Sequence, residues 1–130
     1  VLDARFGDRQ DFGIASFTID PDNDKPHVLK QYSEDYGIKS QNWHFLTDKK
    51  SRVYELANSG FSIFAGINPA AAGGFEHQGY FALIDKNGYI RSRVDRFDNP
   101  IVYYSGLDLV DQDIQGVDML LEDVELLLKE

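Results

Sequence analysis

The sequence predicts a single α/β domain in which helices cover a mixed β-sheet. Two observations lead to this prediction. The 130 residues are 42% hydrophobic and 13% aromatic, which suffices to bury one core. Short apolar runs alternate with segments of helical spacing in the order β-α-β-α-β-ββ-α, and this order is typical of layered α/β folds.

The first part of the chain predicts a strand followed by a helix. Residues 1–10 read as the end of a helix and a turn, and residues 12–19 form a nearly continuous apolar run. Such a run is typical of an interior strand that is buried on both faces. A helix is expected from Pro26, where a missing N–H costs nothing, to Gly37, which suits a left-handed cap.

The middle of the chain predicts a second strand, a second helix and a third short strand. Residues 43–46 are the strand, and Thr47 is the expected N-cap of a helix that ends at Gly60. An apolar segment at 61–65 is the next strand. The glycine-rich residues 66–76 are expected to form a loop.

The last part of the chain predicts a hairpin and a terminal helix. Residues 80–85 and 89–95 flank Lys86-Asn87-Gly88, and Asn-Gly is a strong hairpin signal. Residues 96–115 are expected to be irregular. Apolar residues recur with helical spacing over 117–128, which predicts an amphipathic helix.

The charge of the chain excludes some classes of partner. Asp and Glu number 22 against 13 Lys and Arg, which gives a formal net charge of −9. Phosphate backbones repel such a chain, so no nucleic-acid partner is expected. The chain has no cysteine and therefore forms no disulfide.

Four segments occur in a characteristic series. In chain order they are "FTIDPDNDKPHVLKQYSEDYG", "WHFLT", "EHQGYFALIDKNGYIR" and an apolar terminal helix. Over residues 12–128 this series resembles the Sco/SenC family of thioredoxin-like proteins. The resemblance implies a thioredoxin-like mixed sheet flanked by helices.

The resemblance also implies a function. Sco-like proteins are copper metallochaperones or thiol-disulfide redox proteins of cytochrome c oxidase assembly. A cytochrome c oxidase subunit or another redox partner protein is therefore the expected partner. An extracytoplasmic (periplasmic) location is implied, with a membrane anchor in a segment not present here. The family's copper site uses two cysteines of a C-x-x-x-C motif and a histidine that aligns with His77, and Asp20 and Asp24 lie near that site.

The chain departs from the family in having no cysteine. The first strand and the cysteine turn are expected to fall before Val1, so residues 1–130 are interpreted as one Sco/SenC-type domain truncated at its N-terminus. Three explanations stay open: a fragment, an upstream segment supplied in another way, or a rebuilt homologue without cysteines. Copper(I) prefers thiolates, so tight copper binding by this chain is not expected. Thiol-disulfide oxidoreductase activity would require upstream cysteines.

The three histidines have different interpretations. By residue type alone, His77 reads as a strand-end histidine bonded to backbone or water, whereas the resemblance places it at the copper site. His27 is predicted to lie on the surface in the first turn of a helix. His44 is predicted to point away from the flanking aromatic side chains of its strand.

The acidic turn, residues 20–24, has aspartates at positions 1, 3 and 5 of a calcium-loop pattern. Position 6 is Lys25 instead of glycine, and position 12 is Gln31 instead of glutamate. The pattern therefore fails, and no calcium site is expected. The alternative is that these carboxylates end a strand and favour the positive N-terminus of the following helix.

A second class of function stays open beside the Sco-like one. The chain could be a non-catalytic thioredoxin-like interaction module that docks a partner through its acidic surface and the long segment 96–115. Within that segment, Tyr103 and Tyr104 either form an exposed contact patch or fill a gap under the loop.

Overall fold

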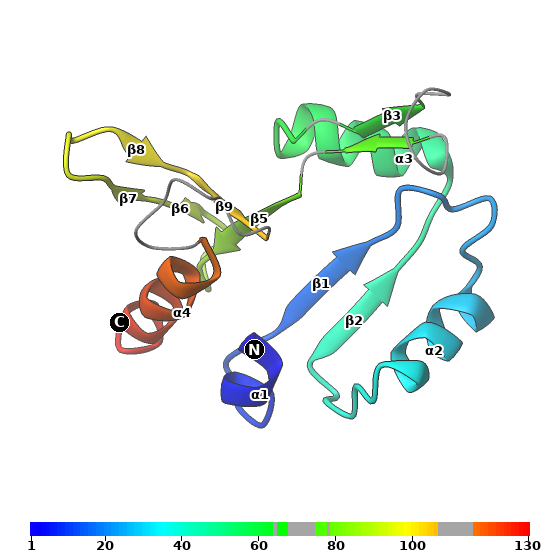
Figure 1. The fold of residues 1–130 in the computed structure, drawn as a ribbon, viewed down its shortest axis with the longest axis horizontal. Coiled ribbons are helices and arrows are strands. Elements are labelled where there is room, and N and C mark those ends of the chain that lie inside the picture. The colour runs from blue at the N-terminus through cyan, green and yellow to red at the C-terminus, as the bar shows by residue number, and fades with distance from the viewer. Residues whose placement is uncertain (64, 68–74, 78, 107–115) are drawn as a thin grey trace. The chain divides into compact units, whose positions relative to one another are not determined.

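The computed structural model contains two compact units, Val1–Gln78 and Gly79–Glu130 (Figure 1). The residues that the structure describes are 1–63, 65–67, 75–77, 79–106 and 116–130. Each unit combines helices with short strands, so the predicted α/β class is confirmed.

The first unit is built around a parallel pair of strands. Its elements are α1 (Leu2–Phe6), β1 (Ile14–Phe17), α2 (Pro26–Asp35), β2 (Trp43–Leu46), α3 (Lys50–Glu55), the π-helical η1 (Leu56–Gly60), β3 (Ala65–Ile67) and β4 (Phe75–His77). β1 and β2 run parallel, with Ile14 opposite Trp43. β3 and β4 form a separate antiparallel pair.

The local signals for α2 are confirmed. Pro26 occupies the first helical position, and Gly37 has a φ of +66° just beyond the end of the helix. At such a φ, a residue with a Cβ is strained. No residue of α2 is fully buried, and Tyr36 is 69% exposed. Two apolar side chains of the helix, Val28 and Tyr32, are also exposed, so α2 keeps much apolar surface in contact with solvent.

The prediction of an interior strand over residues 12–19 is wrong for the described residues. β1 covers only Ile14–Phe17, and its side chains alternate between half-buried and exposed, with Phe17 46% exposed. In the described part of the chain β1 pairs with β2 alone. The alternation shows that one face of the pair is open, and an apolar run cannot distinguish this from burial on both faces.

Three details of the next segment also differ from expectation. α3 begins at Lys50 after Lys49, so Thr47 is not its N-cap, and the Asp48 carboxylate instead accepts the Lys49 N–H at 2.7 Å. Residues 61–63 lie outside any strand, and Ser62 has a positive φ. The strand begins at Ala65, and β3 and β4 occupy both ends of the predicted 66–76 loop.

The second unit joins strands to the C-terminal helix. Its elements are β5 (Tyr80–Ile84), β6 (Ile90–Arg91), β7 (Arg93–Val94), β8 (Pro100–Ile101), β9 (Tyr103–Ser105) and α4 (Gly116–Leu128). β5 pairs antiparallel with both β6 and β9, and β7 with β8. The predicted antiparallel hairpin and terminal helix are confirmed. The prediction of irregular structure is wrong for residues 100–101 and 103–105, which pair with the nearby β7 and with the more distant β5.

Each unit has its own small core. Phe6 and Val53 are buried in the first unit, and Tyr104, Leu120 and Val124 in the second. Tyr104 is 1% exposed, so its interpretation as part of an exposed contact patch is wrong. Residues 107–115 of the loop that it is expected to lie under are outside the described residues. Within the described ranges, no helix is long and apolar enough to cross a membrane.

Candidate functional site

The acidic turn follows β1 at the carboxyl ends of the parallel strands, an edge where α/β folds commonly place functional groups. Its two half-buried carboxylates are held by neutral donors. The Thr18 hydroxyl donates to Asp24 Oδ2 at 2.5 Å and accepts the Asp20 N–H at 2.9 Å. The Asn23 amide donates to both oxygens of Asp20 at 3.1 and 3.0 Å. The turn is therefore ordered by its own side chains.

The third carboxylate of the turn faces a helix. Asp22 Oδ2 lies 2.7 Å from Nζ of Lys50, the first residue of α3. The hydrogen bond and the charge of Lys50 lower the pKa of Asp22, and the same contact raises the pKa of Lys50. One turn further along α3, the Tyr54 hydroxyl donates to the Ile19 carbonyl at 2.8 Å. α3 thus anchors the turn at two points.

This geometry gives the three aspartates separate partners. Asp22 is neutralised by a cation, whereas Asp20 and Asp24 accept hydrogen bonds from uncharged groups. Across the part of the chain that the structure describes, no three His, Asp or Glu side chains are grouped so that they could hold a metal ion. The turn therefore holds the carboxylates of Asp20 and Asp24 in fixed positions beside the ion pair of Asp22 and Lys50.

His77 is the last residue of β4, where its backbone lies opposite Ala65 of β3. The position of its side chain lies outside what the structure describes. That His77 shares a site with Asp20 and Asp24 therefore stays a prediction. His27 and His44 are both exposed, His27 in the first turn of α2 and His44 between two half-buried aromatics of β2, as predicted.

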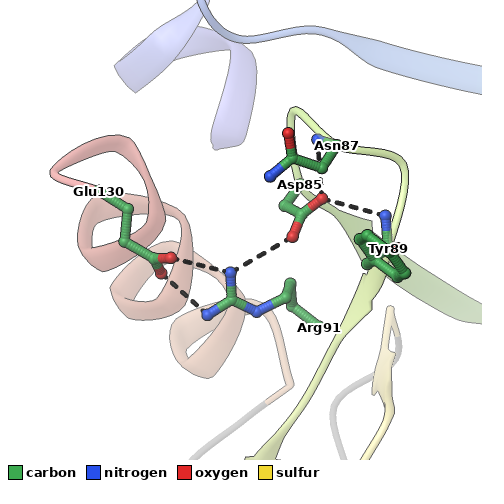
Figure 2. Close-up of polar contacts among 5 residues, drawn as sticks. All are labelled: Asp85, Asn87, Tyr89, Arg91 and Glu130. Carbon is green, nitrogen blue, oxygen red and sulfur yellow. Dashed lines mark hydrogen bonds and ion pairs between the residues drawn. The ribbon is translucent and has the colours of Figure 1, made fainter.

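A polar cluster that the sequence did not predict lies at the 85–89 hairpin (Figure 2). The Asp85 carboxylate accepts the N–H groups of Asn87 and Tyr89 at 2.9 and 3.0 Å, and the Tyr89 contact chiefly lowers its pKa. Arg91 lies 3.4 Å from Asp85 and forms two hydrogen bonds with Glu130 at 3.0 and 2.9 Å. The Asp that precedes Asn-Gly by two residues is the sequence signal that could have indicated this turn.

A second missed contact joins β9 to α4. The Tyr104 hydroxyl donates to Asp123 Oδ2 at 2.6 Å, and Arg93 Nη1 lies 3.6 Å from the same oxygen. Burial of Tyr104, followed by its contact with Asp123, raises the pKa of the phenol, which therefore keeps its proton. Both contacts stabilise the second unit and form no reactive centre.

The donor set of the chain does not fit copper(I). Soft thiolates are the preferred ligands of this ion, and the chain contains no cysteine. Two of the three histidines are exposed on different elements, α2 and β2. At most one imidazole of the predicted site, that of His77, is available from these 130 residues.

The comparisons with known proteins agree on one family. The SCO1/SenC family model matches residues 1–110. The chain is 35% identical over 81 residues to the SCO1 protein homolog of Bacillus subtilis (strain 168), which covers 62% of this chain and 42% of that protein. The crystal structure of a SCO1/SenC family lipoprotein from Bacillus anthracis str. Ames matches with a TM-score of 0.67 and 25% identity, over 91% of this chain and 61% of that one.

These matches have two consequences for the fold and the extent of the chain. The chain spans less than half of the Bacillus subtilis relative and about three fifths of the solved structure. The structural likeness confirms the thioredoxin-like α/β fold, and the family match supports a Sco-like role in general. The chain belongs to the SCO1/SenC family.

Proposed function

We propose that this chain is the scaffold part of a Sco-like protein that handles copper or thiols for cytochrome c oxidase assembly. The observation that carries the proposal is the family match over residues 1–110, together with the order of the acidic turn, β2 and the 85–89 hairpin. In this proposal His77 supplies one imidazole ligand to the copper cargo, and two thiolates come from residues other than these 130. Asp20 and Asp24 lie beside that site and affect thiol acidity or partner recognition.

The proposal includes a location and a partner. The solved relative is described as a lipoprotein, which supports an extracytoplasmic protein held at a membrane. The partner is a cytochrome c oxidase subunit or another redox protein of the same compartment. The order within the acidic turn supports a recognition role, because preformed carboxylates lose little entropy on binding.

Competition for copper(I) tests the proposal. The chain and its His77→Ala variant are titrated against bicinchoninate without oxygen, and both should compete equally poorly. Extending the chain at Val1 with a strand and C-x-x-x-C turn of the family type should create tight binding. In the extended protein His77→Ala should weaken copper(I) binding by roughly tenfold or more, since one of three ligands is lost.

The matched control is His44→Ala, which removes an exposed imidazole from β2. It should leave copper(I) affinity unchanged in the extended protein. Tight binding by the cysteine-free chain would contradict the proposal. An equal loss in the His44 and His77 variants would also contradict it, since the imidazole would then not be specific.

One observation favours a second function, a non-catalytic thioredoxin-like module that docks a partner through its acidic surface. That observation is the absence of cysteine from 130 residues with a net charge of −9. If the extended protein does not bind copper(I) tightly although it is folded, this second function is the better one. Salt dependence of partner binding then measures the contribution of the acidic surface.

A further inference from the structure

An open groove of about 440 Å³ lies between α2 and β2 in the first unit. Figure 1 shows α2 on the side of β2 that faces away from β1. Every residue from 43 to 47 lines the groove, opposite Leu29 and Lys30 of α2. Side chains of a strand alternate between its two faces, so a groove that touches five successive residues follows the edge of β2. We call it the edge groove.

Among the residues that the structure describes, none pairs with the backbone groups that β2 directs away from β1. The Ile14 and Thr18 N–H groups donate to the carbonyls of Asn42 and Leu46 at 2.8 and 3.1 Å. Because alternate residues of a strand face the same neighbour, the even-numbered residues of β2 face β1. Trp43, Phe45 and Thr47 therefore direct their N–H and C=O groups into the edge groove. Over the described ranges, β1 is the only strand that pairs with β2.

The aromatic wall of the edge groove is held in place. The rings of Trp43 and Phe45 stack with centroids 5.3 Å apart, and Tyr32 of α2 meets Phe45 edge-on at 5.6 Å. The Trp43 indole N–H donates to the Ser16 hydroxyl at 3.0 Å. A wall fixed in this way is ready for apolar side chains and loses little entropy when it is covered.

The charge of the edge groove is opposite to that of the chain. The protein has 22 Asp and Glu residues, yet none of those that the structure describes lines the groove, and Lys30 is the cation that does. Among the residues that the structure describes, no carboxylate forms an ion pair with Lys30. An incoming carboxylate therefore meets the Lys30 cation and no carboxylate among the lining residues that the structure describes, and physiological salt screens charges more than about 8 Å away.

We propose that the edge groove binds an extended segment of a partner protein, which adds to β2 as a further strand and places a carboxylate beside Lys30. Backbone pairing would supply affinity, and alternate apolar side chains would cover the aromatic wall. A second copy of the chain fits less well, because it would bring its own Lys30 to the same contact. The inference concerns β2 and α2 and is independent of the copper proposal.

The test uses the 130-residue chain and a defined probe, an N-acetylated, fluorescein-labelled octapeptide of alternating valine and glutamate. Fluorescence anisotropy should show saturable binding. The same peptide N-methylated at alternate residues should not bind, because it cannot pair as a strand. In ¹⁵N-resolved NMR spectra the amides of Trp43, Phe45 and Thr47 should shift more than those of His44 and Leu46.

Charge is tested with a matched pair of variants. Lys30→Glu should weaken binding of the valine–glutamate peptide about fivefold, the value of a single favourable charge contact. Lys39→Glu makes the same change of net charge at an exposed residue that does not line the groove, and it should have little effect. An octapeptide of alternating valine and lysine should bind weakly to the unmodified chain.

Several results would overturn the inference. They are no binding of the valine–glutamate peptide at millimolar concentration, equal binding of its N-methylated form, and equal effects of the Lys30 and Lys39 variants. Concentration-dependent dimerisation that shifts the same three amides would assign the edge groove to a second copy of the chain. Both substitutions affect exposed side chains, and circular dichroism confirms that each variant is folded.

Discussion

Replacing Tyr104 by phenylalanine removes one buried hydroxyl and little else. Its hydroxyl donates to Asp123 Oδ2 at 2.6 Å, and the tyrosine is 1% exposed. Hydrogen bonds to charged groups contribute about 1.5–3 kcal/mol, and a buried carboxylate that loses its donor costs more if nothing replaces it. Asp123 keeps Arg93 at 3.6 Å and is itself 14% exposed. The expected loss of unfolding free energy is therefore at the lower end, about 1.5–2 kcal/mol.

Native-state hydrogen exchange of the α4 amides measures this loss within the second unit. Leu120 and Val124 are buried on the face of α4 that belongs to the core, and their exchange should become about ten- to thirtyfold faster. Tyr89→Phe is the matched control because Tyr89 is 69% exposed. Tyr89→Phe should lower the free energy of unfolding by no more than about 0.5 kcal/mol.

A double-mutant cycle separates the hydrogen bond from packing. In an Asp123→Asn background the cost of Tyr104→Phe should fall, because the charged acceptor is absent. The reasoning is refuted if Tyr104→Phe costs no more than Tyr89→Phe. It is also refuted if the cost is the same with and without the Asp123 carboxylate, since packing would then account for all of it.

Three further predictions concern turns and close backbone approaches. Gly116→Ala should cost more than about 2 kcal/mol in thermal unfolding, because its Cβ would overlap the backbone of Ser105, whereas Gly60→Ala meets only a flexible side chain and should cost less than about 1 kcal/mol. The pKa of Asp85 is lowered in the folded state, so the stability that its carboxylate contributes is present above the unfolded pKa of about 3.9 and is lost as the pH falls through the lower folded pKa. Asp85→Asn should remove this part of the loss of stability in acid, which NMR-monitored acid unfolding measures. Millimolar calcium should leave the melting temperature unchanged, since Asp22 is paired with Lys50, and a rise of several degrees would show that the acidic turn binds the ion.

The elements that sequence reasoning located are those with strong local signals. Pro26 and Gly37 delimit α2, Asn87 and Gly88 form the hairpin turn, and Gly88 has the positive φ that this turn requires. Each of these residues restricts its own backbone, so the signal is independent of tertiary structure. The amphipathic pattern of α4 is informative for a similar reason, because its period is local.

The elements that were missed depend on distant partners. β9 exists because residues 103–105 pair with β5, more than twenty residues earlier, and β3 requires β4 across the glycine-rich segment. Neither segment has a run long enough to predict a strand alone. Residue type favours Thr47 as a cap, but α3 has Lys49 at its N-cap and no side-chain capping hydrogen bond. Whether such short segments form strands depends on pairing with residues distant in sequence, and local composition does not indicate that pairing.

The candidate site shows the same division. The spacing of the aspartates indicates the acidic turn, but it does not indicate the partners of the carboxylates. Thr18, just after β1, binds Asp24, and Lys50 of α3 binds Asp22, and only the fold brings these residues to the turn. No sequence pattern indicated the edge groove. The charge of its lining depends on which residues lie at one edge of β2, and an acidic composition does not predict a groove whose described lining residues include no carboxylate.

The two proposals make separable demands on the first unit. The copper proposal makes the affinity of the extended protein depend on the imidazole of His77, whereas the strand-addition proposal depends on the outer backbone edge of β2 and on Lys30. His77→Ala should therefore leave binding of the valine–glutamate peptide within about twofold, and Lys30→Glu should leave copper(I) affinity within the same range. If each substitution weakens both ligands, the copper ligand and the groove are energetically coupled. The Sco-like site and the partner segment would then have to be treated as one binding unit instead of two.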